Sequence, residues 1–424
     1  MPPTIFISAG EASGEHYGAL LASALFHKFA PKGGTVERGM GGPRMAAAGV
    51  RCIVRAEDMA VMGLTEVVLH LPRIYREFQK LKRAIRANPP TIAILIDFPE
   101  INFRLAREFH RLGVPVIYFV SPQLWAWKQH RIRLVREYVR RMLVIFPFEE
   151  SYYRTRGVDA EFVGHPLADL PQPSITREQF AAENNLDPAR VWIGLLPGSR
   201  LREIEDNLPE MLAAAALLGD AYDFLIPLAP TLDAAQRAKV QRIVDAHGSN
   251  LSIQLISDRG AEGAVSPTAG GARATLLHAR ASVVASGTAT VEAALFGNPF
   301  VVVYRVSPLT YAIAKRMVKV PHVAMANLIA GKRVVPELIQ HDFTAANIVQ
   351  HLSPLLPDGP ARESMMKELA AIREALHVHE ANRPSQTQAA QSAIERVAAI
   401  VVKEVESLSR APAATAESVQ TVGR

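Results

Sequence analysis

Asp97 is the first residue whose type and position suggest chemistry. It directly follows residues 92–96, an uninterrupted run of Ile, Ala and Leu that is typical of a buried strand. A carboxylate at a strand's carboxyl end can take the proton from an attacking alcohol, provided that burial or a neighbour adjusts its basicity. Glu100 and Asn102 are near enough in sequence to orient it. The alternative interpretation is an Asx turn before Pro99.

Residues 285–292, with the sequence ASGTATVE, indicate an anion site. A strand ends there in small residues and a helix begins, so unpaired N–H groups and the helix dipole favour a diphosphate. Ser286, Gly287 and Thr288 would hold that group, and Glu292 would accept hydrogen bonds from two ribose hydroxyls. The alternative is an ordinary helix start with an acid in its first turn.

A matching element lies at residues 196–200, with the sequence LPGSR. Ser199 follows a glycine at another strand end, and the Arg200 guanidinium can clamp a phosphate with two hydrogen bonds. Alternatively, Arg200 pairs with Glu203 on a solvated helix. Two such elements at neighbouring strand ends favour the phosphate interpretation.

The loop at residues 8–16 resembles a dinucleotide loop only superficially, because it lacks the G-x-G-x-x-G pattern. Glu11 and Glu15 at a helix start would repel a pyrophosphate. We therefore assign Glu11 and Ser13 to a neutral, hydroxyl-rich acceptor. For Glu15 a helix-capping role is the alternative.

Residues 67–86 predict a helix with two apolar faces. One face is expected to pack on a sheet; it carries Val67, Leu71, Ile74, Phe78, Leu81 and Ile85. Val68 and Leu69 project from the other side, beside Arg73, Arg76 and Lys80. Apolar residues next to clustered cations suit an anionic bilayer surface, whereas a dimer or interdomain contact is the alternative.

Two tryptophans flank Ala126 and enter a basic helix. Trp125 and Trp127 would suit base stacking, a membrane interface or burial under the sheet rim. No recognised nucleic-acid module accompanies them, and we expect no nucleic-acid partner.

Composition and charge narrow the class of protein. The 424 residues are 49% hydrophobic and 21% charged, which is ordinary for a globular chain of two or three domains. The single Cys52 leaves no intramolecular disulfide, and no apolar run is long enough to span a membrane, so a cytoplasmic protein is expected. Residues 1–170 contain 23 Lys and Arg against 16 Asp and Glu, which indicates an anionic partner for this half. No spacing typical of a metal site is present, and we expect no metal and no cofactor.

Apolar runs alternate with amphipathic stretches, which predicts an α/β chain with parallel sheets. The expected strands are residues 4–8, 91–96, 116–120, 141–145, 192–196, 224–228, 251–256, 282–285 and 300–304. They divide into two doubly wound, Rossmann-like domains facing a cleft. The expected regions are a first domain at 1–170, a linker at 166–187, a second domain at 188–342, helices at 343–410 and a disordered tail at 411–424. The helices would cross back onto the first domain or pack on a partner chain as a homodimer.

Short motifs follow one another along the chain: SAGEASG at 8–14, GGPRM at 41–45, MG at 62–63, DFPEIN at 97–102, SPQLWAW at 121–127, FVGHP at 162–166, LPGSR at 196–200, SGTAT at 286–290 and NLIAG at 327–331. In this order they closely resemble the motifs of lipid-A-disaccharide synthases, from about residue 5 to residue 340.

The resemblance implies an inverting, GT-B type hexosyltransferase that is peripheral to the anionic inner-membrane surface. It would transfer 2,3-diacylglucosamine from UDP-2,3-diacylglucosamine to 2,3-diacylglucosamine 1-phosphate, giving the β-1,6 lipid A disaccharide and UDP. By the same resemblance Asp97 is the base, while Arg200, Glu292 and Asn327 surround UDP and Gln340 lies beside them.

Two stretches depart from the family pattern: the Gly- and Ala-rich residues 259–273 and the chain beyond residue 408. Two other functions remain open at this point. A UDP-N-acetylglucosamine 2-epimerase or a peptidoglycan glycosyltransferase shares the fold, and a two-domain ligand receptor would need no Asp97.

Overall fold

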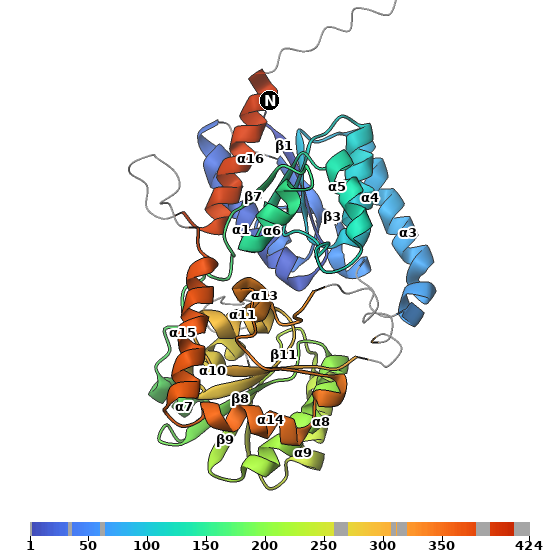
Figure 1. Cartoon of the computed structure of the whole chain (residues 1–424). Coiled ribbons are helices and arrows are strands. Elements are labelled where there is room, and N and C mark those ends of the chain that lie inside the picture. The colour runs from blue at the N-terminus through green and yellow to red at the C-terminus, as the bar shows by residue number, and fades with distance from the viewer. Residues whose placement is uncertain are drawn as a thin grey trace, which may run out of the picture. The chain divides into compact units, whose positions relative to one another are not determined.

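The computed structural model describes residues 2–32, 36–59, 64–257, 270–306, 311, 320–378 and 391–410. The chain divides into two compact units (Figure 1). The first unit consists of Met1–Pro166 and Val378–Arg424, and the second of Leu167–His377. Each unit is described by itself.

The first unit is built on a seven-stranded sheet of order β3-β2-β1-β4-β5-β6-β7, and every neighbouring pair is parallel. Its strands are β1 (Thr4–Ala9), β2 (Val36–Gly41), β3 (Arg51–Arg55), β4 (Ile92–Ile96), β5 (Val116–Phe119), β6 (Arg141–Val144) and β7 (Ala160–Phe162). Its helices are α1 (Ala12–Phe29), α2 (Pro43–Ala47), α3 (Leu64–Ala87), α4 (Pro99–Arg111), α5 (Ile132–Tyr138), α6 (Pro147–Arg154) and α16 (Ala393–Arg410). Short 3-10 turns lie at Ala30–Lys32, Ala56–Asp58 and Gln129–Arg131.

The second unit is built on a six-stranded parallel sheet of order β10-β9-β8-β11-β12-β13. Its strands are β8 (Val191–Leu196), β9 (Tyr222–Pro227), β10 (Ser252–Ile256), β11 (Ala281–Ala285), β12 (Phe300–Tyr304) and β13 (Glu337–Ile339). Its helices are α7 (Arg177–Asn184), α8 (Leu201–Leu218), α9 (Ala234–His247), α10 (Gly271–His278), α11 (Thr288–Leu295), α13 (Met325–Ala330), α14 (Ala345–Leu352) and α15 (Pro360–Ala375). The turns Gln340–Asp342 and Ser353–Leu355 are 3-10.

The central strands have buried side chains on both faces, because helices cover both sides of a doubly wound sheet. All five residues of β4 and all five of β11 are buried. Since all strands of a sheet run in parallel, the turns that follow them meet at one edge. Asp97 lies at this edge in the first unit, and Ser199 and Ser286 lie at it in the second.

The expected α/β class with two parallel sheets is confirmed, and every predicted strand corresponds to an observed one. Four further strands, β2, β3, β7 and β13, are absent from the sequence-based prediction. Three of these lie at a sheet edge, where polar residues interrupt the apolar pattern.

The 166–187 stretch is not a plain linker. It contains α7, which begins with a capping box: the Thr176 hydroxyl accepts from the Gln179 N–H and the Gln179 side chain accepts from the Thr176 N–H. Phe180 on this helix packs on the Trp192 ring, so the helix belongs to the second unit.

The C-terminal helices divide differently from the expectation that residues 343–410 pack together on the first domain. α14 packs on α8, and α15 packs on α11 and α13, all within the second unit. Among the described helices of this range, α16 alone belongs to the first unit, where it packs along α1. Ion pairs fix it there, from Lys28 to Glu395 and from Arg140 and Arg141 to Glu404. Residues 411–424 lie outside the described part.

The amino-terminal half of α3 also differs from expectation. Leu81 and Ile85 are buried as predicted, but Leu71 is 51% exposed. The helix has 24 residues and is therefore about 36 Å long, whereas a strand of five residues spans about 17 Å. A helix of this length extends past a five-residue strand, which accounts for the exposure of Leu71.

Candidate active site

Asp97 lies in a tight turn between β4 and α4 in which both Asp97 and Phe98 have left-handed backbone angles, with φ of 46° and 48°. This conformation is unfavourable for residues other than glycine. Two buried donors hold the turn: the Asn102 amide and the Tyr118 hydroxyl each donate to the Asp97 carbonyl oxygen, both at 2.6 Å. Ser8 completes the arrangement by donating to the Asn102 side-chain oxygen at 2.7 Å. Asn102 is therefore a positioning residue for Asp97.

Gly10 is required beside this turn. A Cβ atom at that position would lie 2.2 Å from the Phe98 ring, so any side chain would displace the ring and the turn with it. The third residue of the SAGEASG motif is thus a glycine because the backbone there approaches Phe98 closely.

The electrostatics of Asp97 suit proton transfer near neutral pH. Burial raises the pKa of its carboxyl to about 7, and the charge of Glu11 adds to this effect. A carboxyl with that pKa is a competent general base under ordinary conditions.

The two glutamates of the first loop have different roles. Glu15 accepts hydrogen bonds from the backbone N–H groups of Arg44 at 2.7 Å and Met45 at 3.3 Å, and so caps α2. This is the capping alternative noted above. Glu11 precedes α1 without capping it, and half-buried Ser13 lies in the first turn of that helix. Glu11 thus remains available beside Asp97.

The buried Glu149 carboxyl holds the loop after β5 in place through hydrogen bonds. One Glu149 oxygen accepts from the Ser121 hydroxyl at 2.6 Å and from the Trp125 indole at 2.9 Å. The other accepts from the Phe146 N–H at 3.2 Å, at the start of α6. Burial raises the pKa of Glu149 to about 7. Trp125 is therefore buried, whereas Trp127 is 41% exposed.

The LPGSR motif follows β8 in the second unit. Gly198 has φ 129°, a conformation that favours glycine. The Ser199 N–H donates to Glu203 at 3.1 Å, and the exposed Arg200 guanidinium binds the same carboxylate at 3.0 Å. Both donors assigned to a phosphate thus face an internal anion, as the alternative interpretation held. Glu203 occupies the place of the expected ligand charge.

The SGT motif forms the start of α11, as predicted. The Ser286 N–H donates to Val303, and the Thr290 hydroxyl donates to the Gly287 carbonyl at 2.7 Å. Gly287 and Thr288 are exposed at this helix start. Its first N–H groups therefore face outward at the carboxyl edge of the sheet.

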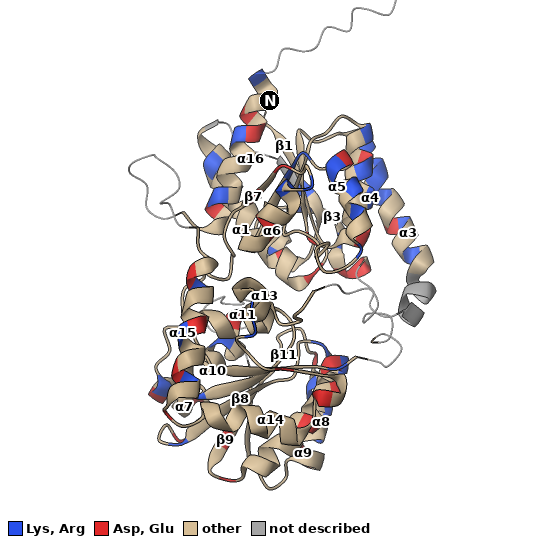
Figure 2. Cartoon of the chain, viewed as in Figure 1, with Lys and Arg blue, Asp and Glu red and all other residues tan. Residues whose placement is uncertain are grey.

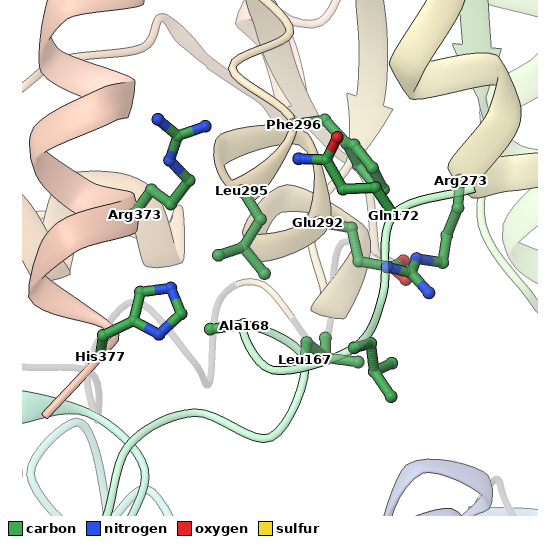
Figure 3. Close-up of a pocket in the computed structure, with 10 residues that line it drawn as sticks. Leu167, Ala168, Gln172, Arg273, Glu292, Leu295, Phe296, Arg373 and His377 are labelled. Carbon is green, nitrogen blue, oxygen red and sulfur yellow. The ribbon is translucent and has the colours of Figure 1, made fainter. Parts of the chain in front are cut away.

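A cavity of about 230 Å³ lies in the second unit beside α11 (Figure 3). Glu292 reaches it from α11, Arg273 from α10, and Arg373 and His377 from the end of α15 (Figure 3). Burial lowers the pKa of Arg273, while the Glu292 charge opposes that shift. The predicted ligand-binding role of Glu292 is thus supported by its position in the wall of a cavity.

Asn327, which the resemblance places around UDP, makes its side-chain hydrogen bonds within the second unit. It is fully buried, and its amide donates to Val335 and to Glu337 while its oxygen accepts from Val334 and Val335. An Asn side chain has two donors and two acceptor positions, so none is left for a ligand. Glu337 in turn accepts from the N–H groups that precede α13. Asn327 therefore fastens this loop and reaches a ligand only through it.

Gln340 is likewise engaged within the unit. Its side chain accepts from the Val306 N–H at 3.2 Å and donates to the Val306 carbonyl at 2.9 Å, in the manner of a neighbouring strand. Its own φ is 55°, directly after β13.

Three residues of these sites were missed at first: Tyr118, Glu149 and Tyr304. Tyr304 ends β12 in partial exposure; burial raises its pKa, with the charge of Glu203 adding to the effect and that of Arg200 opposing it. An aromatic residue at the carboxyl end of a predicted strand was a usable signal. For Glu149 the local sequence gives little signal, because two of its three donors come from residues 24 and 28 positions away.

The cations of α3 are exposed, as the membrane-face hypothesis requires. Arg73 pairs with Asp58, and Arg76 and Lys80 pair with Glu77 at 3.7 and 3.6 Å. Tyr75 is 66% exposed on the same helix. The Val68 and Leu69 side chains lie outside the described part, as do residues 258–269 of the Gly- and Ala-rich stretch.

Comparison with known proteins decides the family. A family model described as lipid-A-disaccharide synthetase matches residues 5–393. The chain is 60% identical over 383 residues to the lipid-A-disaccharide synthase of Acidobacterium capsulatum, covering 88% of this chain and 92% of that protein. It is 49% identical over 391 residues to that of Koribacter versatilis, covering 92% and 97%.

This chain belongs to the lipid-A-disaccharide synthase family.

Solved structures of other proteins support a GT-B fold for this member of the lipid-A-disaccharide synthase family. The calicheamicin glycosyltransferase is similar with a TM-score of 0.54 and 17% identity, covering 97% of this chain and 99% of that one. UDP-GlcNAc 2-epimerase from Neisseria meningitidis gives a TM-score of 0.56 at 12% identity, covering 95% and 99%. The fold is thus shared by transferases and epimerases, and the family match distinguishes between them.

Within the described ranges, no helix has the length and apolar character needed to cross a membrane. The same residues contain no group of three or more His, Cys, Asp or Glu side chains placed to hold a metal ion.

Proposed function

We propose that this family member is an inverting glycosyltransferase that joins two acylated glucosamines. The donor is UDP-2,3-diacylglucosamine, the acceptor is 2,3-diacylglucosamine 1-phosphate, and the products are the β-1,6 lipid A disaccharide 1-phosphate and UDP. The Asp97 carboxyl carries the proposal, because its turn is held in a strained conformation and its pKa is raised to about 7 by burial and by Glu11. Family membership supplies the substrate class.

In the proposed reaction, Asp97 takes the proton from the acceptor's 6-hydroxyl group as the oxygen attacks the anomeric carbon of the donor. The new C–O bond forms on the face opposite UDP, and the bond to the diphosphate oxygen breaks, with its electron pair leaving on UDP. One inversion needs one general base and a stabilised leaving group. Glu11 and Ser13 are proposed to bind acceptor hydroxyls.

We assign the donor's UDP part to the second unit. The exposed N–H groups of Gly287 and Thr288, with the Ser286 hydroxyl, suit the diphosphate. Arg200 and Ser199 would exchange Glu203 for the same anion, because a phosphate offers more negative charge than one carboxylate. Glu292 is proposed to bind the ribose at the cavity that it lines.

We further infer a peripheral location on the cytoplasmic side of the inner membrane. The support is α3, where exposed Leu71 and Tyr75 lie among Arg73, Arg76 and Lys80. Apolar side chains next to cations favour an anionic bilayer surface. A homodimer formed by exchange of α16 would require this helix to leave α1 of its own chain, and light scattering would detect the dimer.

The test supplies purified protein with UDP-2,3-diacylglucosamine, with and without the monosaccharide 1-phosphate, and resolves the products by mass spectrometry. UDP release that depends on the acceptor, together with a tetraacyl disaccharide 1-phosphate, is expected. Isomerised donor without acceptor would indicate an epimerase. UDP binding without any product would indicate a receptor.

A further inference from the structure

The connection between β5 and α5 presents an exposed aromatic and cationic surface that the mechanism above does not use. The Trp127 indole is 41% exposed, and the Lys128 ammonium lies 4.1 Å from the centre of its ring. Lys128 and Arg131 both bind the Glu100 carboxylate, Lys128 at 3.0 Å and Arg131 through two nitrogens at 2.9 and 3.2 Å. We call Trp127, Lys128 and Arg131 the Trp-Lys-Arg surface.

This surface is held rigidly from beneath. Besides the Glu149 bonds to Ser121 and Trp125, the Tyr153 hydroxyl donates to Pro122 and the Tyr152 hydroxyl to Leu124, each at 3.1 Å. Lys128 itself has φ 52°, a strained conformation that its surroundings must maintain. A surface loop with only a solvent-exposed ion pair would need none of these restraints.

The Trp-Lys-Arg surface lies next to the proposed base. Glu100 is in the first turn of α4, three residues after Asp97, and β4 pairs with β5. Two cations face one carboxylate there, which leaves a positive excess. Figure 2 shows that Lys and Arg gather on α3, α4 and α5 of this unit.

The cations are less exposed than their counterion. The side chains of Lys128 and Arg131 are 23% and 21% exposed, whereas that of Glu100 is 54% exposed. Glu100 can therefore swing into solvent while both cations stay in place. A phosphate monoester with its two charges would replace it, and an Arg guanidinium matches phosphate oxygens with two hydrogen bonds.

We propose that the Trp-Lys-Arg surface is the acceptor's recognition site: Lys128 and Arg131 bind the phosphate monoester of the acceptor, and the Trp127 ring packs on the sugar. This inference rests on the proposed function and assigns to it the selection of a phosphorylated acceptor. Aromatic rings provide a flat apolar surface with one polar edge, which suits the CH groups of a sugar face. A phospholipid headgroup has related phosphate chemistry, but α3 exposes both Leu71 and Tyr75 beside its cations, whereas Trp127 is the one apolar side chain of the Trp-Lys-Arg surface.

The experiment uses the full chain and compares two acceptors, the acylated monosaccharide with and without its 1-phosphate. The readout is the ratio of kcat/KM for the two. Wild type is expected to prefer the phosphorylated acceptor, and Lys128→Gln with Arg131→Gln is expected to reduce that preference by about tenfold or more. UDP affinity should not change.

Two further variants separate the roles. Arg136→Gln removes the same charge from α5 at a position near Gly157, away from Glu100, and should leave the ratio unchanged. Trp127→Ala should lower kcat/KM for both acceptors by the same factor, because it removes the sugar contact and not the phosphate contact.

Suppose that the wild-type protein is active and that the Lys128 and Arg131 double variant has the wild-type ratio of kcat/KM for the two acceptors. This result overturns the present inference and leaves the proposed function standing. Loss of binding to vesicles of anionic phospholipid in that variant, again with an unchanged ratio, would assign the cations to a headgroup instead. A wild-type protein that transfers to neither acceptor overturns the proposed function and this inference together.

Discussion

The Asn102 side-chain amide lies 2.6 Å from the carbonyl oxygen of Asp97 and donates a hydrogen bond to it. Asn102 is buried and five residues further along the chain, on the helix that the strained turn begins. The proposed base is therefore held by its own motif. The Tyr118 hydroxyl reaches the same carbonyl oxygen from β5, so two elements fix one peptide group.

Tyr118→Phe is expected to lower kcat by about tenfold with little change in UDP affinity. Removal of the hydroxyl frees one of the two restraints on the Asp97 carbonyl, at a cost of about 1 kcal/mol in stability. Tyr153→Phe is the matched control for stability, since it removes an equally buried hydroxyl that binds Pro122 instead; because this bond supports the Trp-Lys-Arg surface, its effect should appear in the KM for the acceptor and not in kcat. Equal effects of the two variants on kcat would contradict a positioning role for Tyr118.

The pH dependence of turnover is expected to follow Asp97. A base acts when deprotonated, so kcat/KM should rise with pH and level off above a midpoint of about 7. Asp97→Asn should bind UDP and lose turnover. Glu11→Gln should move the midpoint down, because the charge of Glu11 raises the pKa of Asp97. Glu15→Gln serves as control, and a midpoint that both variants move equally would refute the assignment.

Stability should fall as pH rises from about 4.5 to about 7, in part because of Glu149. Burial raises the pKa of this carboxyl from 4.5 to about 7, so across that range the folded chain binds a proton that the unfolded chain has lost. The contribution is therefore complete below pH 4.5 and lost above about 7, amounting to about 1–3 kcal/mol. Asp97 contributes with the same sign. Urea unfolding at several pH values measures the free energy of unfolding as a function of pH. For Glu149→Gln this free energy should depend less steeply on pH than for wild type, and an unchanged pH dependence would contradict the contribution assigned to Glu149.

Asn327→Ala is expected to destabilise the second unit by about 3 kcal/mol or more. Its removal leaves the N–H groups of Val334 and Val335 without their side-chain acceptor and takes away one of the donors to Glu337. The folded fraction should bind UDP with an affinity lowered only modestly. Full stability together with a large loss of UDP affinity would instead support the direct contact expected from sequence.

Liposome binding should depend on α3. Val68→Ser with Leu69→Ser, and separately Leu71→Ser with Tyr75→Ser, are expected to reduce sedimentation with anionic vesicles several-fold while sparing UDP affinity. Leu217→Ser, on α8, removes an apolar side chain that is 63% exposed in the second unit and provides the control. Sedimentation that none of these changes reduces would reject a membrane face on α3.

The sequence was sufficient for the centre of each sheet. β4 and β11 are buried on both faces, so each is a continuous apolar run followed by a recognisable turn, and Asp97 and Ser286 are located by counting from it. β3 and β13 were not predicted because edge strands contain charged residues, here Arg51 in β3 and Glu337 in β13. α7 also escaped, although its capping box is visible in the sequence.

Residue types and spacing by themselves determined the fold class, the family and the side chains that could take a proton or bind an anion. Tertiary structure alone decided which of those side chains are free. In the folded chain, Asn327 and Gln340 are hydrogen-bonded to the backbone and Glu15 caps α2, whereas Glu11 lies beside Asp97. The physical reason is that a hydrogen-bonding group is committed by partners distant in sequence, and burial then sets both its availability and its pKa.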